Sequence, residues 1–267
     1  MLAKALNLNP DRIAVTELFG AIGSPARTSE WVRMLKAIEE NKHIRALVID
    51  VDCPGGGAGA SEFMYRSVVK VAKKKPVIAF VRGTCASGGY MVACASAKVI
   101  AVPMAVVGSI GVISMRPMLY DLLEKIGVRM EVTKAGRLKD MFSNFREPTD
   151  EERTKEQALL DSFYDRFVSL VAEERGMSNE RVRELATGEI FTAEQAQRNG
   201  LIDELGDLDT AIDLAQKMAN LSERKVTYAR PHRGLRDRLL ANTATGLMES
   251  FAYAIEGRLG HSRIELR

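Results

Sequence analysis

Residues 76–97, with the sequence PVIAFVRGTCASGGYMVACASA, decide how the rest of the chain is interpreted. The stretch begins with an apolar run typical of a buried strand and ends with an alanine-rich run compatible with a helix. Ser87 lies between them and is followed by two glycines. A serine at a strand-to-helix turn exposes its hydroxyl, beside helix amides that have no internal partner. An acyl-transfer nucleophile needs these groups, whereas the structural alternative is a turn with Ser87 as an N-cap.

The composition is that of a soluble globular protein. The 267 residues are enough for one large α/β domain or for a domain with a helical appendage, and they are 46% hydrophobic and 27% charged. The 38 basic and 35 acidic residues give a net charge of +3, and the lysine run 73–75 follows a predicted helix, so no nucleic-acid partner is expected. No signal peptide opens the chain, and the uncharged stretch 99–115 is too short and too interrupted to span a membrane.

Predicted strands and helices alternate along the first half of the chain, which predicts a parallel sheet with right-handed crossovers. Strands are predicted at 12–18, 46–51, 77–81, 99–102 and 128–132. Helices are predicted at 30–41 with Thr28 or Ser29 as cap, at 60–74, from Ser87, and at 117–126. Further helices are predicted at 149–175, from Ser178, from Thr192 and at 208–220.

This pattern suggests three regions. Residues 1–148 are expected to form an α/β core, and residues 149–230 a helical extension that completes the same domain. Residues 231–267 form a basic helical tail with an apolar stripe. Such a stripe is typical of a contact with the core or with another subunit, and membrane contact is the less favoured interpretation.

A second glycine-rich turn, 52–57, follows the strand that precedes 77–81 in the chain. It lacks the Lys-Ser/Thr pair of a phosphate-binding loop, which argues against nucleotide binding. In a parallel sheet both turns lie at the carboxyl edge, so an amide from 52–57 and the amide of Gly88 are placed to form an oxyanion hole beside Ser87. Two purely structural turns are the alternative.

Few side chains in the sequence are candidates for a general base that would activate Ser87. His43, His232 and His261 lie near a surface helix end or in the basic tail, so a Ser-His triad is not expected. A buried lysine kept neutral is the other option, and Lys139, followed by Met141 and Phe142, is a weak candidate for it.

The cysteines and histidines indicate no metal site. Cys53, Cys85 and Cys94 are odd in number and lie in or beside apolar segments, which predicts buried free thiols. No CxxC or histidine-rich spacing is present, so neither a metal nor a cofactor is expected.

Several segments of the chain resemble motifs of the signal peptide peptidase A family and occur in the same order as in that family. Its members are serine proteases that have a Ser–Lys dyad on a ClpP/crotonase-like fold. The resemblance extends from Arg12 to about Asn220. The segments that carry it are 52–57, 86–90, 108–112, Lys139-Asp140 with Arg146-Glu147, and Gly188 with 201–206. It implies an α/β fold with repeated β-β-α and βαβ units, a parallel sheet and a helical C-terminal region.

The resemblance also implies a role for each matching residue. Ser87 corresponds to the nucleophile, Lys139 to the general base, and Ser109 to a serine that orients the lysine. The amides of Gly56 and Gly88 correspond to the oxyanion hole. The implied reaction is hydrolysis of peptides through an acyl-enzyme, without a cofactor or a metal.

Substrates and partners are likewise expected from the resemblance. The family degrades remnant signal peptides and other peptides with small or apolar side chains, and members of this length form closed homo-oligomeric rings. Members are usually anchored in a bacterial or archaeal membrane by an N-terminal helix, which this chain lacks. It is therefore expected to be either a catalytic domain of a longer protein or a soluble branch. Cys53 also replaces a serine that is frequent in the family, a change that affects loop packing more than catalysis.

Two other functions remain open at this point. A crotonase-type acyl-CoA enzyme would use the same two turns for a thioester, but the glutamates expected of a hydratase are not found in the matching turns. A non-catalytic ring scaffold would not need both Ser87 and Lys139.

Overall fold

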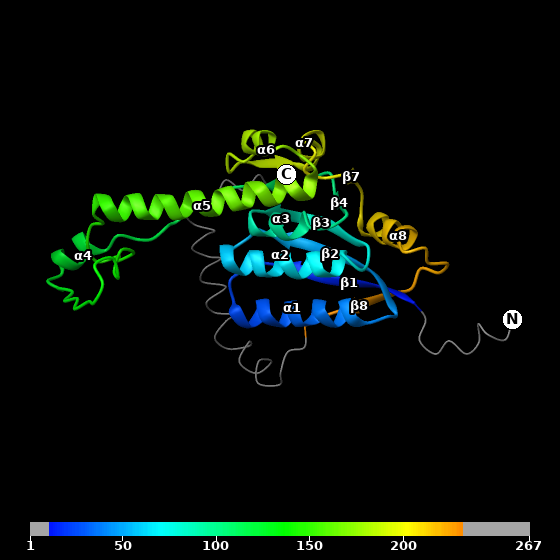
Figure 1. Ribbon diagram of the computed structural model, residues 1–267, viewed down its shortest axis with the longest axis horizontal. Helices are drawn as coiled ribbons and strands as arrows, with labels where there is room; N and C mark the ends of the chain where they lie inside the picture. Colours follow the sequence, from blue (N-terminus) through cyan, green and yellow to red (C-terminus); the bar gives the residue numbers. More distant parts are fainter. Residues whose placement is uncertain (1–10, 232–267) are drawn as a thin grey trace, which may run out of the picture. The chain divides into compact units, whose positions relative to one another are not determined.

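An eight-stranded sheet forms the centre of the protein (Figure 1). The computed structural model describes residues 11–231. The strands lie in the order β6-β5-β3-β2-β1-β8, and β4 pairs with both β3 and β7. All pairs are parallel except β5 with β6, which confirms the predicted parallel sheet. The strands are β1 (Arg12–Phe19), β2 (Ile44–Cys53), β3 (Val77–Ala86), β4 (Lys98–Ala101), β5 (Val106–Gly108), β6 (Ile190–Thr192), β7 (Glu204–Leu205) and β8 (Val226–Ala229).

Helices cover both faces of the sheet. On one face, α1, α2, α3 and the C-terminal part of α5 contribute to the larger apolar core, and on the other α8 contributes to the smaller one. The helices are α1 (Pro25–Glu40), α2 (Ala58–Ala72), α3 (Gly88–Ala93), α4 (Tyr120–Lys125), α5 (Asp150–Arg175), α6 (Asn179–Leu185), α7 (Ala193–Arg198) and α8 (Leu208–Met218).

The middle segments of the central strands, 46–49 in β2 and 77–81 in β3, are entirely apolar because both of their faces are buried. Along β2, Leu47 and Ile49 face the larger core, whereas Val48 between them faces α8. The register continues into β3, where Val48 pairs with Ile78 and Ile49 with Ala79. This pairing brings the carboxyl ends of β2 and β3 to the same edge.

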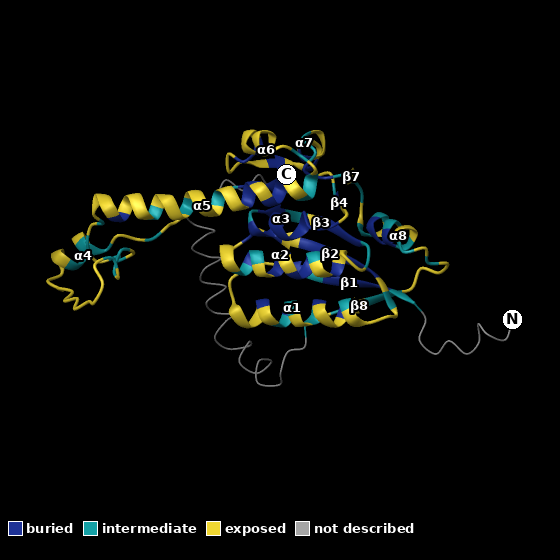
Figure 2. Cartoon of the chain, viewed as in Figure 1, coloured by how far each residue is buried: buried dark blue, intermediate teal, exposed yellow. Residues whose placement is uncertain are grey.

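Residues 113–148, here called the arm, leave this body and extend away from the sheet with the start of α5 (Figure 1). No side chain of the arm is buried, as Figure 2 shows by its colours. The predicted strand 128–132 is wrong, because no described strand lies beside it to pair with, and Val128, Met130 and Val132 are exposed. The predicted helix 117–126 is shorter than expected and comprises only α4.

Two helix starts show how capping sets the boundaries. Helix α1 begins at Pro25, earlier than the predicted Thr28 or Ser29, because Ser24 accepts the amide of Arg27 at 3.4 Å and proline suits the first helical position. Helix α5 starts where expected, with a capping box between Thr149 and Glu152.

The predicted tail 231–267 lies almost entirely outside the described residues. Within residues 11–231, no helix has both the length and the apolar character that crossing a bilayer requires.

Tyr90 provides a test of how α3 is held. Its fully buried hydroxyl donates to the carbonyl of Leu201 at 2.8 Å. Tyr90→Phe is expected to lower the free energy of unfolding by about 1–3 kcal/mol, because that buried carbonyl loses its partner. Urea unfolding measures the change. Tyr228→Phe, at a side chain 61% exposed, is the control and is expected to change the free energy by less than about 0.5 kcal/mol. Equal effects of the two variants would contradict this account.

Candidate active site

Ser87 occupies a strained turn between β3 and α3. Its backbone has φ +49° and ψ −124°, a conformation that a residue with a side chain rarely adopts. Ser87 precedes the first residue of α3, yet its side chain makes no capping hydrogen bond. The capping interpretation therefore does not explain Ser87, whose hydroxyl is left available for other chemistry.

Ser109 occupies the equivalent position on the neighbouring strand. Strands β3 and β5 are parallel, with Ala86 opposite Gly108, and the amide of Ser87 donates to the carbonyl of Gly108 at 2.8 Å. Ser109 follows directly and has the same positive φ of +49°. The two serines therefore leave adjacent strands at the same level of the sheet edge.

The first glycine turn is held in place by Ile22, which precedes α1. The amide of Ile22 donates to the carbonyl of Gly55 at 2.7 Å, and its carbonyl accepts the amide of Gly57 at 2.8 Å. Because the C=O of Gly55 and the N–H of Gly56 belong to one trans peptide group and point in opposite directions, the amide of Gly56 points away from Ile22. A β-carbon on Gly56, whose φ is +152°, would lie only 1.8 Å from the carbonyl oxygen of Ile22.

The two glycine turns lie in direct contact. The amide nitrogen of Gly56 is 3.4 Å from the position that a β-carbon on Gly88 would take. A β-carbon on Gly55 would in turn lie 2.7 Å from both the amide nitrogen of Gly88 and the β-carbon of Ser87. The amide of Gly88 begins α3 and has no partner within that helix. Two backbone donors thus lie close to the Ser87 side chain.

A side-chain carboxylate connects the carboxyl ends of β2 and β3. Asp52, near the end of β2, accepts a hydrogen bond at 2.9 Å from the backbone amide of Thr84, near the end of β3. The pairing shifts between Val51 and Cys53, an irregularity that alters the direction of the chain just before the glycines.

Lys139 lies in the arm and is exposed. Its amide donates to the carbonyl of Gly136 at 3.1 Å. Among residues 11–231, no hydrogen bond joins the Lys139 side chain to Ser87 or Ser109, and the arm that carries Lys139 extends away from the sheet (Figure 1). The structure therefore brings Ser87, Ser109, Gly56 and Gly88 to one edge of the sheet and leaves the predicted base apart from them.

The three cysteines lie near this edge but are not suited to nucleophilic attack. All are free and buried, which confirms the prediction for their thiols. Burial raises the pKa of Cys53 to about 11 and those of Cys85 and Cys94 above the ordinary value, so none is a thiolate at neutral pH. Within the described part of the chain, no group of histidine, cysteine or acidic side chains is arranged to hold a metal ion.

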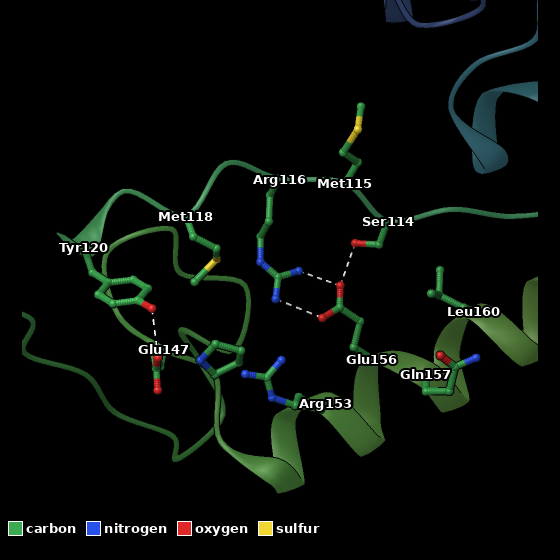
Figure 3. Close-up of a pocket in the computed structure, with 11 residues that line it drawn as sticks. Ser114, Met115, Arg116, Met118, Tyr120, Glu147, Arg153, Glu156, Gln157 and Leu160 are labelled. Carbon is green, nitrogen blue, oxygen red and sulfur yellow. Dashed lines mark hydrogen bonds and ion pairs between the residues drawn. The ribbon is translucent and has the colours of Figure 1, made fainter. Parts of the chain in front are cut away.

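A pocket of about 530 Å³ lies where the arm meets the start of α5 (Figure 3). Arg116 crosses it and forms a bidentate pair with Glu156, at 2.5 and 2.9 Å. Ser114 donates to the same carboxylate at 2.6 Å, and the hydroxyl of Tyr120 donates to Glu147 at 2.8 Å. None of the five predicted site residues lines the pocket. The contacts of Ser114 and Arg116 with Glu156 connect the arm to α5.

Two supporting residues were not found from the sequence. Ser61 of α2 lies directly behind Gly88, and Ile22 fixes the first glycine turn through its backbone. Backbone groups carry no side-chain signature, so Ile22 had no signal at all. Ser61 was one of several serines in a predicted helix, and nothing in the spacing marked it.

Together, a parallel α/β sheet and a serine on a strained turn beside two glycine amides define the class of ClpP-like folds. Two solved structures share the fold. The first is a membrane-bound stomatin-specific protease in complex with a substrate peptide, which has a TM-score of 0.58 and 18% identity and covers 88% of this chain and 98% of that one. The second is ClpP1 of Listeria monocytogenes, which has a TM-score of 0.50 and 15% identity and covers 79% of this chain and 99% of that one.

Residues 69–222 match the model of peptidase family S49, and the chain belongs to this family. It is 40% identical to a protein of Synechocystis named as a protease, over 80% of this chain and 77% of that one. It is 38% identical to an Enterococcus faecium protein named as signal peptide peptidase SppA, over 73% of this chain. The chain spans 57% of that relative's length and 63% of a Methanocaldococcus jannaschii relative's.

The packing of Ser61 against Gly88 leads to a test of this turn. An added β-carbon there would lie 2.1 Å from the Ser61 hydroxyl, so Gly88→Ala is expected to lower the free energy of unfolding by about 1–3 kcal/mol through overpacking. Gly59→Ala is the matched control, because nothing lies within 4 Å of its added β-carbon and alanine favours helix α2. Thermal and urea unfolding measure both variants. A neutral Gly88→Ala would show that Ser61 does not pack closely against Gly88.

Proposed function

We propose that the chain is a serine endopeptidase that hydrolyses apolar peptides, such as remnant signal peptides, through a Ser87–Lys139 dyad. The observation that carries the proposal is the strained turn that presents Ser87 beside the amides of Gly56 and Gly88. Membership of peptidase family S49 and the resemblance at Lys139 support the base assignment.

The proposed reaction begins with attack of Ser87 Oγ on a peptide carbonyl carbon, while Lys139 takes the hydroxyl proton. The carbonyl oxygen gains negative charge, and the amides of Gly56 and Gly88 stabilise it. The lysine then passes the proton to the leaving amine as the peptide C–N bond breaks. A water molecule, deprotonated by Lys139, cleaves the acyl-enzyme, and the proton returns to Ser87. In this scheme Ser109 orients the lysine amine.

The substrate class is proposed from the relatives. The relative from Enterococcus is named as a signal peptide peptidase, and signal peptides have apolar segments. No charged group of a substrate is required for binding in this proposal.

A second copy of the chain is proposed to complete the dyad, within a homo-oligomeric ring. A lysine that acts as a base has to be desolvated, and Lys139 is exposed within one copy. The arm that carries it also exposes Ile113, Met115 and Ile126, each more than 60% accessible. Several exposed apolar side chains on one segment are typical of a protein interface, so the arm of one copy is proposed to reach the Ser87 edge of its neighbour.

The dyad is tested by cleavage of an apolar peptide that carries a fluorophore and a quencher. Ser87→Ala and Lys139→Ala are each expected to lower kcat by at least about 1,000-fold, because attack needs both the nucleophile and its base. Circular dichroism should show both variants folded. Lys125→Ala, at the end of α4 in the same arm, is the matched control and should retain the wild-type rate. A Lys139→Ala protein with near-normal kcat would contradict the proposal.

The contribution of the second copy is tested by mixing the two inactive proteins. If the dyad forms between copies, an assembly that holds both variants contains sites with an intact Ser87 and an intact Lys139. A mixture of Ser87→Ala and Lys139→Ala is therefore expected to recover roughly a quarter of wild-type activity after subunit exchange, because random pairing restores about one site in four. No recovery in mixtures that mass spectrometry shows to be heteromeric would place both residues in one copy.

A further inference from the structure

The arm holds its lysine loop without a hydrophobic core. No side chain of residues 113–148 is buried, and Lys139 itself is exposed. Burial of apolar surface, which fixes most of the body, therefore does not fix this loop within one copy. Polar contacts have to hold it in position.

Arg146 makes the most extensive of these polar contacts. Its Nε donates to Asp140 Oδ2 at 2.9 Å, and its Nη2 donates to the Asp140 carbonyl at 3.2 Å. On the other side, Nη1 and Nη2 donate to the two carboxylate oxygens of Glu152 at 2.8 and 2.5 Å. Nη1 also donates to the carbonyl of Glu147 at 2.9 Å. One planar guanidinium thus joins the residue after Lys139 to the first turn of α5.

Glu152 holds the side of the Arg146 guanidinium that faces α5 in a fixed position. Its side chain is only 3% exposed, and its Oε2 accepts the amide of Thr149 at 2.8 Å in the capping box of α5. Hydrogen bonds from Arg146 lower the pKa of Glu152 to about 2, so it stays charged at neutral pH. The same helix is buried in the larger core at its other end, through Phe167 and Leu170. The position of Glu152 is therefore set by the body.

Backbone hydrogen bonds of tight turns fix the conformation of Lys139 and Asp140 relative to each other. The amide of Lys139 donates to Gly136 at 3.1 Å, and that of Ser143 donates to the carbonyl of Asp140 at 2.9 Å. Lys134 pairs with the Asp140 carboxylate from the start of the same loop. Fixing Asp140 therefore fixes the backbone from which Lys139 extends.

We propose that Arg146 is the positioning residue of the lysine loop, which clamps Asp140 to Glu152 and so sets where Lys139 is presented to the nucleophile. This inference rests on the proposed function, because it takes Lys139 as the base. Arg146 touches none of the reacting groups in this scheme. It acts by determining the geometry of the base, and small errors in such geometry cost large factors in rate.

The test measures kcat and KM for the apolar peptide with full-length variants. Arg146→Met is expected to lower kcat by about 100-fold, because the base is misplaced, and to change KM less than about threefold, because the peptide-binding edge is untouched. Arg146→Lys is expected to be intermediate, since a single ammonium does not reproduce the two-sided contact. Arg137→Met is the control: Arg137 lies in the same loop and pairs with Glu151 of α5, but 70% of its side chain is exposed. It should stay within about twofold of wild type.

A second variant separates positioning from folding. Asp140→Asn leaves the Arg146–Glu152 pair and the capping box in place, so its melting temperature should match that of wild type. Its kcat is expected to fall about 10-fold, because the contact to the lysine loop is weakened and not removed. Should Arg146→Met fail to fold, Asp140→Asn decides the question.

The outcomes distinguish this inference from the proposed function. Wild-type kcat in Arg146→Met or in a folded Asp140→Asn, together with an inactive Lys139→Ala, would overturn the positioning role and leave the dyad intact. Equal losses in Arg146→Met and Arg137→Met would also overturn it. Normal activity in Lys139→Ala would instead overturn the dyad itself.

Discussion

The close approach of two backbone turns at the carboxyl edge of the sheet is the constraint on which the rest of the site depends. Gly55, Gly56 and Gly88 lie so near one another and near Ile22 and Ser87 that added β-carbons would overlap backbone or side-chain atoms. Only glycine fits at this contact. The parallel register of β2 with β3 and of β3 with β5 brings the turns there, and the hydrogen bond from Thr84 to Asp52 holds the first pair of strand ends together.

Body and arm are stabilised by different physical means. The body buries largely apolar strands between helices on both faces of the sheet, which gives the turn at Ser87 a rigid support and allows Ser87 to keep an unfavourable φ. The arm has no buried side chain and is attached to α5 by charged groups, through Arg116 with Glu156 and Arg146 with Glu152. Such a segment depends on what packs against it, which agrees with a base that acts on a neighbouring copy.

The body could be predicted from the sequence to a large extent, and the arm could not. Unbroken apolar runs such as 77–81 favour a strand buried on both faces, and glycine pairs mark sharp turns. The segment 128–132 has the alternation of a strand but no partner, and pairing is a property of the whole fold. The placement of Ser87, Ser109 and the glycines at one edge of the sheet could be predicted because their motifs are local. The place of Lys139 relative to Ser87 depends on the arm and, in the proposed assembly, on contacts between copies, for which sequence spacing carries no signal.

The most direct test of the central claim, that the strained turn makes Ser87 a nucleophile, is the intact mass of the protein after exposure to a fluorophosphonate. The account predicts one adduct per chain, located by peptide mapping at Ser87 and absent from Ser87→Ala. An adduct on another residue, or an unmodified Ser87 in protein that cleaves peptides, would contradict it.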